Sequence, residues 1–102
     1  MDYQVVLSSS SRTDLQDIVR YISLDDPAKA LEFGRFLIHH TKGLGQFPGR
    51  GRVVPELGDD TIREIFVRSY RVIYRVNHDK GSIEVIRFWH AGRGTPVISQ
   101  AD

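Results

Sequence analysis

The sequence contains no cysteine, so disulfides and thiolate metal sites are excluded and the fold must rest on apolar burial. It also lacks any apolar run approaching the roughly 18 residues that suggest a membrane span. The first residues have neither the basic region nor the apolar stretch of a signal peptide. These absences predict a soluble protein of the reducing cytoplasm without a membrane partner. We expect residues 1–102 to form a single domain, because about 100 residues bury one core.

Neither positive nor negative charge is in large excess. The net charge is +1, whereas proteins that grip the phosphate backbone usually carry a strong basic excess. Residues 50–102 hold nine Lys or Arg against seven Asp or Glu, and Lys80 is their only lysine. Arginine suits protein interfaces and bidentate anion recognition better than lysine does. The charge pattern therefore favours a protein over a nucleic acid as the main partner.

Several motifs of known chemistry are missing as well. The glycine-rich stretch at residues 49–51 precedes a Val-Val-Pro segment instead of a helix, so it is no phosphate-binding loop. No carboxylates have metal-ligand spacing, and no serine lies in a Gly-x-Ser-x-Gly context. We therefore expect neither a cofactor nor a metal.

The first half of the chain predicts a strand and two helices. β-branched and aromatic residues at 3–7 indicate a strand, and residues 11–14 have the spacing of a helix capping box with Asp14 as its acid. Asp26-Pro27 begins a second helix, whose apolar face continues to Leu44 until Gly43, Gly45 and Pro48 end it. Each helix has one apolar stripe, which predicts a hairpin packed on a sheet. The stripe positions are Leu15, Ile18, Val19, Ile22, Ala30, Gly34, Leu37 and Ile38.

The second half predicts β-structure. Residues 53–55, Val-Val-Pro, form a short extended piece that proline keeps at a sheet edge. Strands are then predicted at 62–67, 70–76 and 83–90, joined by connections short enough for antiparallel neighbours. A helical hairpin brings the chain back to the end where the first strand stopped, so the next strand runs antiparallel to the first. Every neighbouring pair in the sheet is then predicted to be antiparallel. The predicted fold is an α+β domain of order β-α-α-β-β-β, with the helical hairpin on one face of an antiparallel sheet.

Arginines and a tryptophan alternate with apolar residues along the last two strands. Arg71 and Arg75 share one face of their strand, and Arg87 with Trp89 join them if the pairing register agrees. Arg93 follows just after the last strand. Because Arg and Trp dominate binding hot spots, we expect an exposed partner-binding surface here. The alternative is a solvated sheet face whose arginine stems cover apolar neighbours.

A second hypothesis for the same region is catalytic. His90 ends the last strand, Arg93 follows it, and Glu64 and Arg71 lie on the preceding strands. In metal-independent RNA cleavage a base accepts the 2′-hydroxyl proton, an acid protonates the leaving oxygen and an arginine stabilises the phosphorane. A lone histidine at a strand end is more often a structural, hydrogen-bonding residue, so catalysis is the second interpretation of these residues.

Short motifs spanning nearly the whole chain occur in the order found in one family. They are Thr13-Asp14-Leu15-Gln16-Asp17-Ile18, Pro27-Ala28-x-Ala30, Phe47-Pro48-x-x-Gly51-Arg52, Arg63-Glu64, Ser69-Tyr70-Arg71-Val72-Ile73-Tyr74-Arg75-Val76 and His90-x-x-Arg93. In this ordered set the sequence resembles the ParE/RelE toxins of type II toxin–antitoxin systems. The resemblance implies a growth inhibitor, encoded on a plasmid it stabilises or on a chromosome. A cognate antitoxin would silence it, with the toxin as a homodimer or in a heterotetramer with the antitoxin.

Two activities are known in this family, and the fold does not choose between them. ParE-type members bind and inhibit DNA gyrase, whereas RelE-type members cut mRNA in the ribosome. The phrases at residues 51–56 and 69–75 are more similar to ParE, and the low net charge is unlike the basic RelE-type nucleases. The resemblance therefore implies a gyrase inhibitor that is not an enzyme, with a target- and antitoxin-binding surface at Arg71, Arg75, Arg87, Trp89 and Arg93. The alternative is a metal-independent endoribonuclease, with ribosome and mRNA as partners and with His90, Arg93, Arg71 and Glu64 as catalytic residues.

Overall fold

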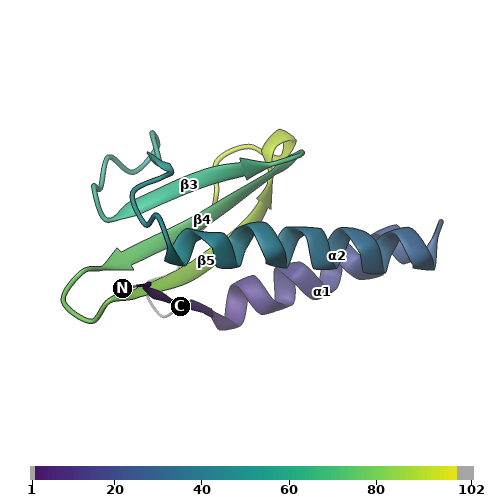
Figure 1. Ribbon diagram of the computed structural model, residues 1–102. Helices are drawn as coiled ribbons and strands as arrows, with labels where there is room; N and C mark the ends of the chain where they lie inside the picture. Colours follow the sequence, from purple (N-terminus) through teal and green to yellow (C-terminus); the bar gives the residue numbers. More distant parts are fainter. Residues whose placement is uncertain (1, 99–102) are drawn as a thin grey trace.

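Two helices lie side by side on one face of a five-stranded sheet (Figure 1). This computed structural model describes residues 2–98. The elements along the chain are β1 (Gln4–Leu7), α1 (Ser9–Ser23), α2 (Pro27–Lys42), the short 3₁₀ helix η1 (Gly43–Gly45), β2 (Arg52–Val53), β3 (Ile62–Val67), β4 (Tyr70–Asn77), β5 (Ser82–His90) and the 3₁₀ helix η2 (Ala91–Arg93). The predicted helical hairpin and the α+β class are confirmed, and the bounds of β3, β4 and β5 agree with the predicted strands within one residue.

The sheet is mixed, with the strand order β1-β5-β4-β3-β2. Neighbours from β2 to β5 are antiparallel, but β1 pairs with β5 in parallel, with Val5 opposite Ile83. The prediction of a wholly antiparallel sheet is therefore wrong at this pair. The cause is β2, whose residues Arg52 and Val53 pair antiparallel with β3. The predicted order had no strand between the helical hairpin and β3. Because β2 adds one reversal of chain direction there, β5 runs in the same direction as β1.

The start of α1 also differs from the prediction. Ser8 is the N-cap, and its hydroxyl accepts a hydrogen bond from the Ser11 N–H at 3.1 Å and donates one to the Ile86 carbonyl at 2.9 Å. The helix therefore begins three residues before the predicted capping box, because a run of four serines offers several equivalent caps. Asp14 is consequently not a capping residue; it lies in the second turn and is buried.

The second helix begins as predicted and ends at the first of the predicted terminators, so that Leu44 lies in η1 and not in α2. The Asp26 carboxylate caps it by accepting from the N–H groups of Ala28 and Lys29, both at 3.1 Å, and Pro27 takes the first helical position. Proline is tolerated there because its missing N–H would have had no partner within the helix. α2 ends at Lys42, directly before Gly43. Within residues 2–98 no helix is long and apolar enough to span a membrane.

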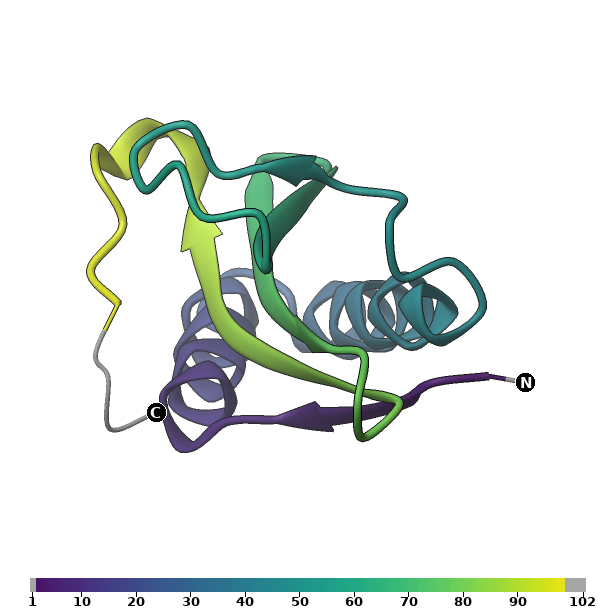
Figure 2. The same cartoon turned by 90° about the vertical axis from the view of Figure 1, so that its left-hand side faces the viewer.

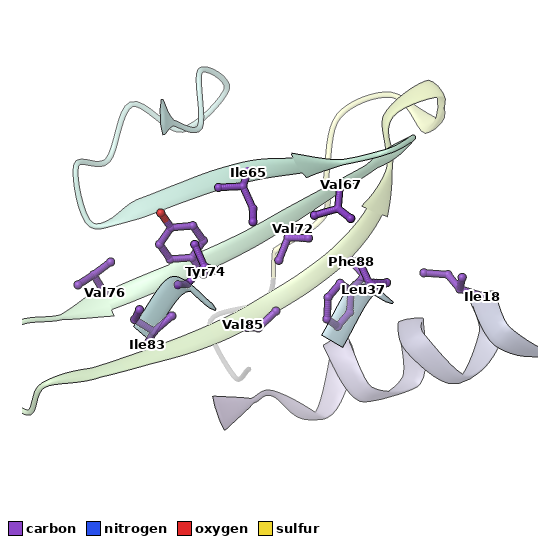
Figure 3. Close-up of a cluster of buried hydrophobic side chains, with 11 residues drawn as sticks. Ile18, Leu37, Ile65, Val67, Val72, Tyr74, Val76, Ile83, Val85 and Phe88 are labelled. Atoms are coloured by element: carbon purple, nitrogen blue, oxygen red, sulfur yellow. The ribbon is translucent and has the colours of Figure 1, made fainter. Parts of the chain in front are cut away.

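One hydrophobic core lies between the helices and the sheet. Figure 3 shows Ile18 of α1, Leu37 of α2 and Phe88 of β5 pointing toward one another. Val72 and Tyr74 of β4 are fully buried in the same core, as their alternation in the sequence predicts. The other buried members are Leu44, Ile65, Val67, Val76, Ile83 and Val85. Of the predicted stripe positions, Ile18, Ala30 and Leu37 are buried and the remaining five are half-buried.

A second, smaller core lies on the opposite face of the sheet. Its buried members are Val54, Ile62, Ile73, Ile86 and Trp89, and Ile98 packs against them. Figure 2 shows the loop before β3 and the segment after β5 on the side of β4 opposite α2. These two segments cover much of the face that the sequence analysis expected to be open.

We expect Leu37→Ala to lower the free energy of unfolding by about 2–5 kcal/mol, because it removes a fully buried side chain from the first core. Leu24, which is 79% exposed, provides the control, and Leu24→Ala should change the free energy by about 0.5 kcal/mol or less. Urea unfolding with an unchanged slope measures both. Equal losses for the two variants would contradict this placement of the core.

Candidate functional site

Arg71, expected on an exposed surface, lies in a buried cluster of ion pairs. It is only 6% exposed, and its guanidinium donates to both carboxylate oxygens of Glu56, each at 2.8 Å, and to Glu64. Glu64 is 1% exposed, and its second oxygen accepts from Nε of Arg52 at 2.8 Å. Each buried charge therefore has a partner of opposite sign, which is the condition under which charges are tolerated inside a protein.

The register of the strands assembles this cluster. Arg52 of β2 lies directly opposite Glu64 of β3, a position from which oppositely charged side chains interact. β2 can approach β3 this closely because residue 51 is glycine: a Cβ there would lie 2.4 Å from the Glu64 carbonyl oxygen. The Tyr74 hydroxyl accepts from the Gly51 N–H and donates to the Pro48 carbonyl, both at 2.9 Å. The turn before β2 is thus fastened to the centre of the sheet.

Electrostatics keep Glu56 and Arg71 of this cluster ionised. Hydrogen bonds from the Arg71 guanidinium lower the pKa of Glu56 from its ordinary value of 4.5 to about 2. The same hydrogen bonds, with those to Glu64, raise the pKa of Arg71. Glu56 belongs to the loop between β2 and β3, so this pair ties the loop to β4. Arg71 contributes to the fold in this way, and its charge is already balanced.

Arg87 is paired as well, but with a helix. Both carboxylate oxygens of Asp14 accept from the Arg87 guanidinium, at 2.7 and 2.8 Å, and one also accepts from the Phe88 N–H at 3.0 Å. A register shift places Arg87 opposite Ile73, while the next residue of β4 pairs with Val85. Such a bulge redirects a side chain. Asp14 therefore accepts a backbone hydrogen bond from β5 beyond the end of β1, where that neighbouring strand no longer provides an acceptor.

Two further predicted site residues have definite partners. Arg75 donates to Glu84 at 3.1 Å, in a partly exposed pair on neighbouring strands. Trp89 is 2% exposed, so its predicted exposure is wrong. The cause is the segment after η2, which folds back so that the Trp89 indole N–H donates to the Gly94 carbonyl at 3.1 Å. Arg93 remains exposed, with its guanidinium 3.9 Å from the centre of the Trp89 ring.

The four residues of the catalytic hypothesis do not form one site. His90 is exposed, its Nδ1 accepts from the Gly92 N–H at 3.1 Å, and its ring meets the Tyr70 ring edge to face. Tyr70 packs against the core on the helix side, whereas Glu64 and Arg71 lie on the opposite face of the sheet. Among the described residues, no three His, Asp or Glu side chains are grouped to hold a metal ion.

A further feature lies on the helical hairpin. It is an apolar groove of about 450 Å³, with a basic rim, between α1 and α2. The groove is lined by Leu15, Val19, Leu31, Gly34 and Ile38, with Arg35, His39 and Lys42 around them. Leu15, Val19, Gly34 and Ile38 belong to the apolar stripes predicted above, and Leu31, three residues before Gly34, widens the stripe of α2 toward the surface.

The molecule is thus a small α+β protein whose helical hairpin covers one face of a mixed sheet and carries an apolar groove. Over residues 5–94 its sequence matches the family described as "ParE toxin of type II toxin-antitoxin system, parDE", and the chain belongs to that family. The search of curated proteins gave no match.

Two solved structures have a similar fold. The first is the chromosomal ParDE TA system from P. aeruginosa, with a TM-score of 0.71 and 21% identity, over 86% of this chain and 95% of that one. The second is the toxin–antitoxin complex RelBE2 from Mycobacterium tuberculosis, with a TM-score of 0.60 and 21% identity, over 88% of this chain and 99% of that one. At this identity the likeness concerns the fold.

The Glu56 ion pair should make stability depend on pH in the acid range. Because the folded-state pKa of about 2 lies below the ordinary 4.5, the pair stabilises the fold above pH 4.5 and is lost as the pH falls toward 2. The difference in melting temperature between wild type and Glu56→Gln should therefore shrink across this window. Glu32→Gln, at an exposed position on α2, is the control and should show no comparable trend. A constant difference for Glu56→Gln would contradict the pairing.

Proposed function

We propose that this ParE-family toxin arrests growth by binding and inhibiting DNA gyrase, and that a cognate antitoxin neutralises it. The observation that carries this proposal is the position of Glu64 and Arg71, which are held in buried ion pairs on the face of the sheet away from His90. Harm to the cell would then follow from occupancy of the target, with no bond broken by the toxin.

The chemistry of RNA cleavage explains why this observation matters. A base, an acid and a cation must reach the same phosphate group at once, and displacements of about 1 Å already reduce rates strongly. Arg71 is neutralised by two carboxylates, and freeing it would leave the buried Glu64 with only the more exposed Arg52 as a partner. Such a change costs several kcal/mol, so the residues support a binding protein better than the RelE-type nuclease.

The groove between α1 and α2 is the proposed antitoxin site. The groove has apolar walls, and Leu31, one of the residues that line it, is 54% exposed. Arg35 and Lys42 lie on its rim. An amphipathic helix with an apolar face and acidic flanks matches this pattern, because such helices bury their apolar face in grooves. The two solved structures of similar fold are titled as toxin–antitoxin systems, which supports an antitoxin as the occupant.

Purified toxin should block supercoiling by DNA gyrase while leaving ribosome-bound mRNA intact. The inhibition should rise with toxin concentration and saturate, as expected for occupancy of a site. The measurements are plasmid supercoiling in vitro and mRNA integrity in arrested cells. Codon-specific mRNA cuts made by the wild type and abolished by His90→Ala would refute this proposal and support the nuclease alternative.

Leu31→Glu should weaken binding of the cognate antitoxin by about 10-fold or more, because it places a carboxylate in an apolar groove facing an acidic partner. Leu24→Glu provides the matched control: it adds the same charge at a more exposed leucine that does not line the groove. Calorimetric titration of both variants separates the effects. If Leu24→Glu weakened binding as much, the groove would not be the site.

A further inference from the structure

A row of aromatic rings crosses the end of the molecule where β3 turns into β4 and β5 ends. Phe36 and Phe33 of α2 lie with their ring centres 6.4 Å apart, and Phe33 is 5.7 Å from Tyr70. Tyr70 meets His90 at 5.3 Å. We call these four residues the ring row. Three of them are half-buried and His90 is exposed, so the row forms part of the molecular surface.

An arginine lies at each end of the ring row. The Arg68 guanidinium is 4.5 Å from the centre of the Phe36 ring, and Arg93 lies beside Tyr70 and His90 in the wall of a shared groove of about 400 Å³. A hydrogen bond from the Ala91 N–H to the Ser69 carbonyl, at 2.8 Å, fixes the turn after β3 against the segment that carries Arg93. The two arginines are thereby held on the same end of the sheet.

The backbone of Arg68 is strained. Its φ of 53° makes it the one non-glycine residue with positive φ among the residues that the structure describes. Arg68 and Ser69 form a two-residue hairpin connection, where glycine is favoured at a position with positive φ. The other hairpin, between β4 and β5, does have a glycine at positive φ, Gly81. Strain of this kind is concentrated at functional sites, so an arginine here calls for a function that glycine would not serve.

Arg68 and Arg93 also differ from the sheet arginines in their charge balance. Arg71, Arg75 and Arg87 each bind a carboxylate. Within residues 2–98, no carboxylate oxygen lies within 4.0 Å of the guanidinium of Arg68 or Arg93, and each is exposed over an aromatic ring. These two positive charges are therefore available to acidic groups of a partner, with which arginine forms strong bidentate hydrogen bonds.

The ring contacts favour a protein over a single-stranded nucleic acid as that partner. Bases bind by stacking on open aromatic faces. Here a guanidinium lies over Phe36, and Tyr70 and His90 meet edge to face at 89°. Those contacts occupy ring faces that would receive bases. Arginine and tyrosine surrounded by half-buried rings instead match the composition of protein hot spots.

We propose that the ring row with Arg68 and Arg93 is the surface that binds the target protein, and that the target presents carboxylates to the two guanidinium groups. The inference rests on the proposed function, inhibition by binding, and adds which surface makes the contact. It also assigns the target to a surface distinct from the antitoxin groove, since no residue of the ring row lines that groove.

The test compares Arg68→Gly and Arg93→Ala with Lys80→Ala. Lys80 is an exposed cation in the other hairpin connection, at the opposite end of β4, so its loss matches the change in charge. For Arg68→Gly and for Arg93→Ala, the toxin concentration that gives half-inhibition of DNA gyrase holoenzyme should be about 10-fold higher than for wild type. For Lys80→Ala it should equal that of wild type. The inhibition should weaken as salt is raised, and less steeply in the two variants.

Folding is monitored separately. Glycine adopts positive φ without steric cost, so Arg68→Gly should melt within a few degrees of wild type and bind antitoxin with unchanged affinity. A purely structural role for Arg68 predicts full inhibition by this variant, and that result would overturn the inference while leaving gyrase inhibition intact. If the arginine variants lost binding to a single-stranded oligonucleotide but kept binding to gyrase, the assignment of a protein partner would be overturned.

Failure of the proposed function gives a different pattern. If wild-type toxin leaves gyrase active, growth arrest in cells still tests the surface. Arrest lost in Arg68→Gly and Arg93→Ala but kept in Lys80→Ala would uphold the ring row as the contact with another protein. Arrest of wild-type strength in all three variants would reject it.

Discussion

The buried pair of Glu64 and Arg71 is the interaction on which the face of the sheet opposite the helices depends. A fully buried carboxylate is tolerated only when its charge is compensated, and Glu64 achieves this through Arg71 and Arg52. Arg71 then holds Glu56, and with it the loop that carries Val54 into the second core. Strands β2, β3 and β4 are thus joined by charge as well as by backbone hydrogen bonds. Removing either partner would leave the other buried charge with one counter-charge fewer and loosen the second core.

This constraint decides which residues are free to meet other molecules. Arg71, Arg75 and Arg87 of the sheet are bound to carboxylates, so the surfaces suited to partners lie elsewhere: in the groove of the helical hairpin and at the ring row near the end of β5. The two surfaces differ in chemistry, since the groove is apolar with a basic rim and the ring row is aromatic, with the exposed guanidinium groups of Arg68 and Arg93 at its ends. Under the proposals made above, antitoxin and target recognise different parts of one small toxin.

Local sequence patterns were sufficient for the elements but not for their distant partners. Alternation placed Val72 and Tyr74 in the core, and a helical stripe placed Leu37 there. The pairing of Asp14 with Arg87 joins residues 73 positions apart, and no local pattern encodes it. The two-residue strand β2 is too short for a clear strand pattern, yet it sets the direction of β3 relative to β1. Arg68 went unnoticed because its positive φ is a property of the folded backbone.

Trp89 shows why composition alone misplaced the binding surface. Tryptophan and arginine together resemble a hot spot in the sequence, but the same two residue types also close a core when chain from elsewhere covers them. Here the segment after η2 supplies that cover, with the Gly94 carbonyl as acceptor for the indole. A substitution at Trp89 would reduce toxicity by unfolding the second core, whatever the target. Loss of toxicity therefore locates a binding surface only at exposed residues such as Arg68 and Arg93, where stability and contact can vary independently.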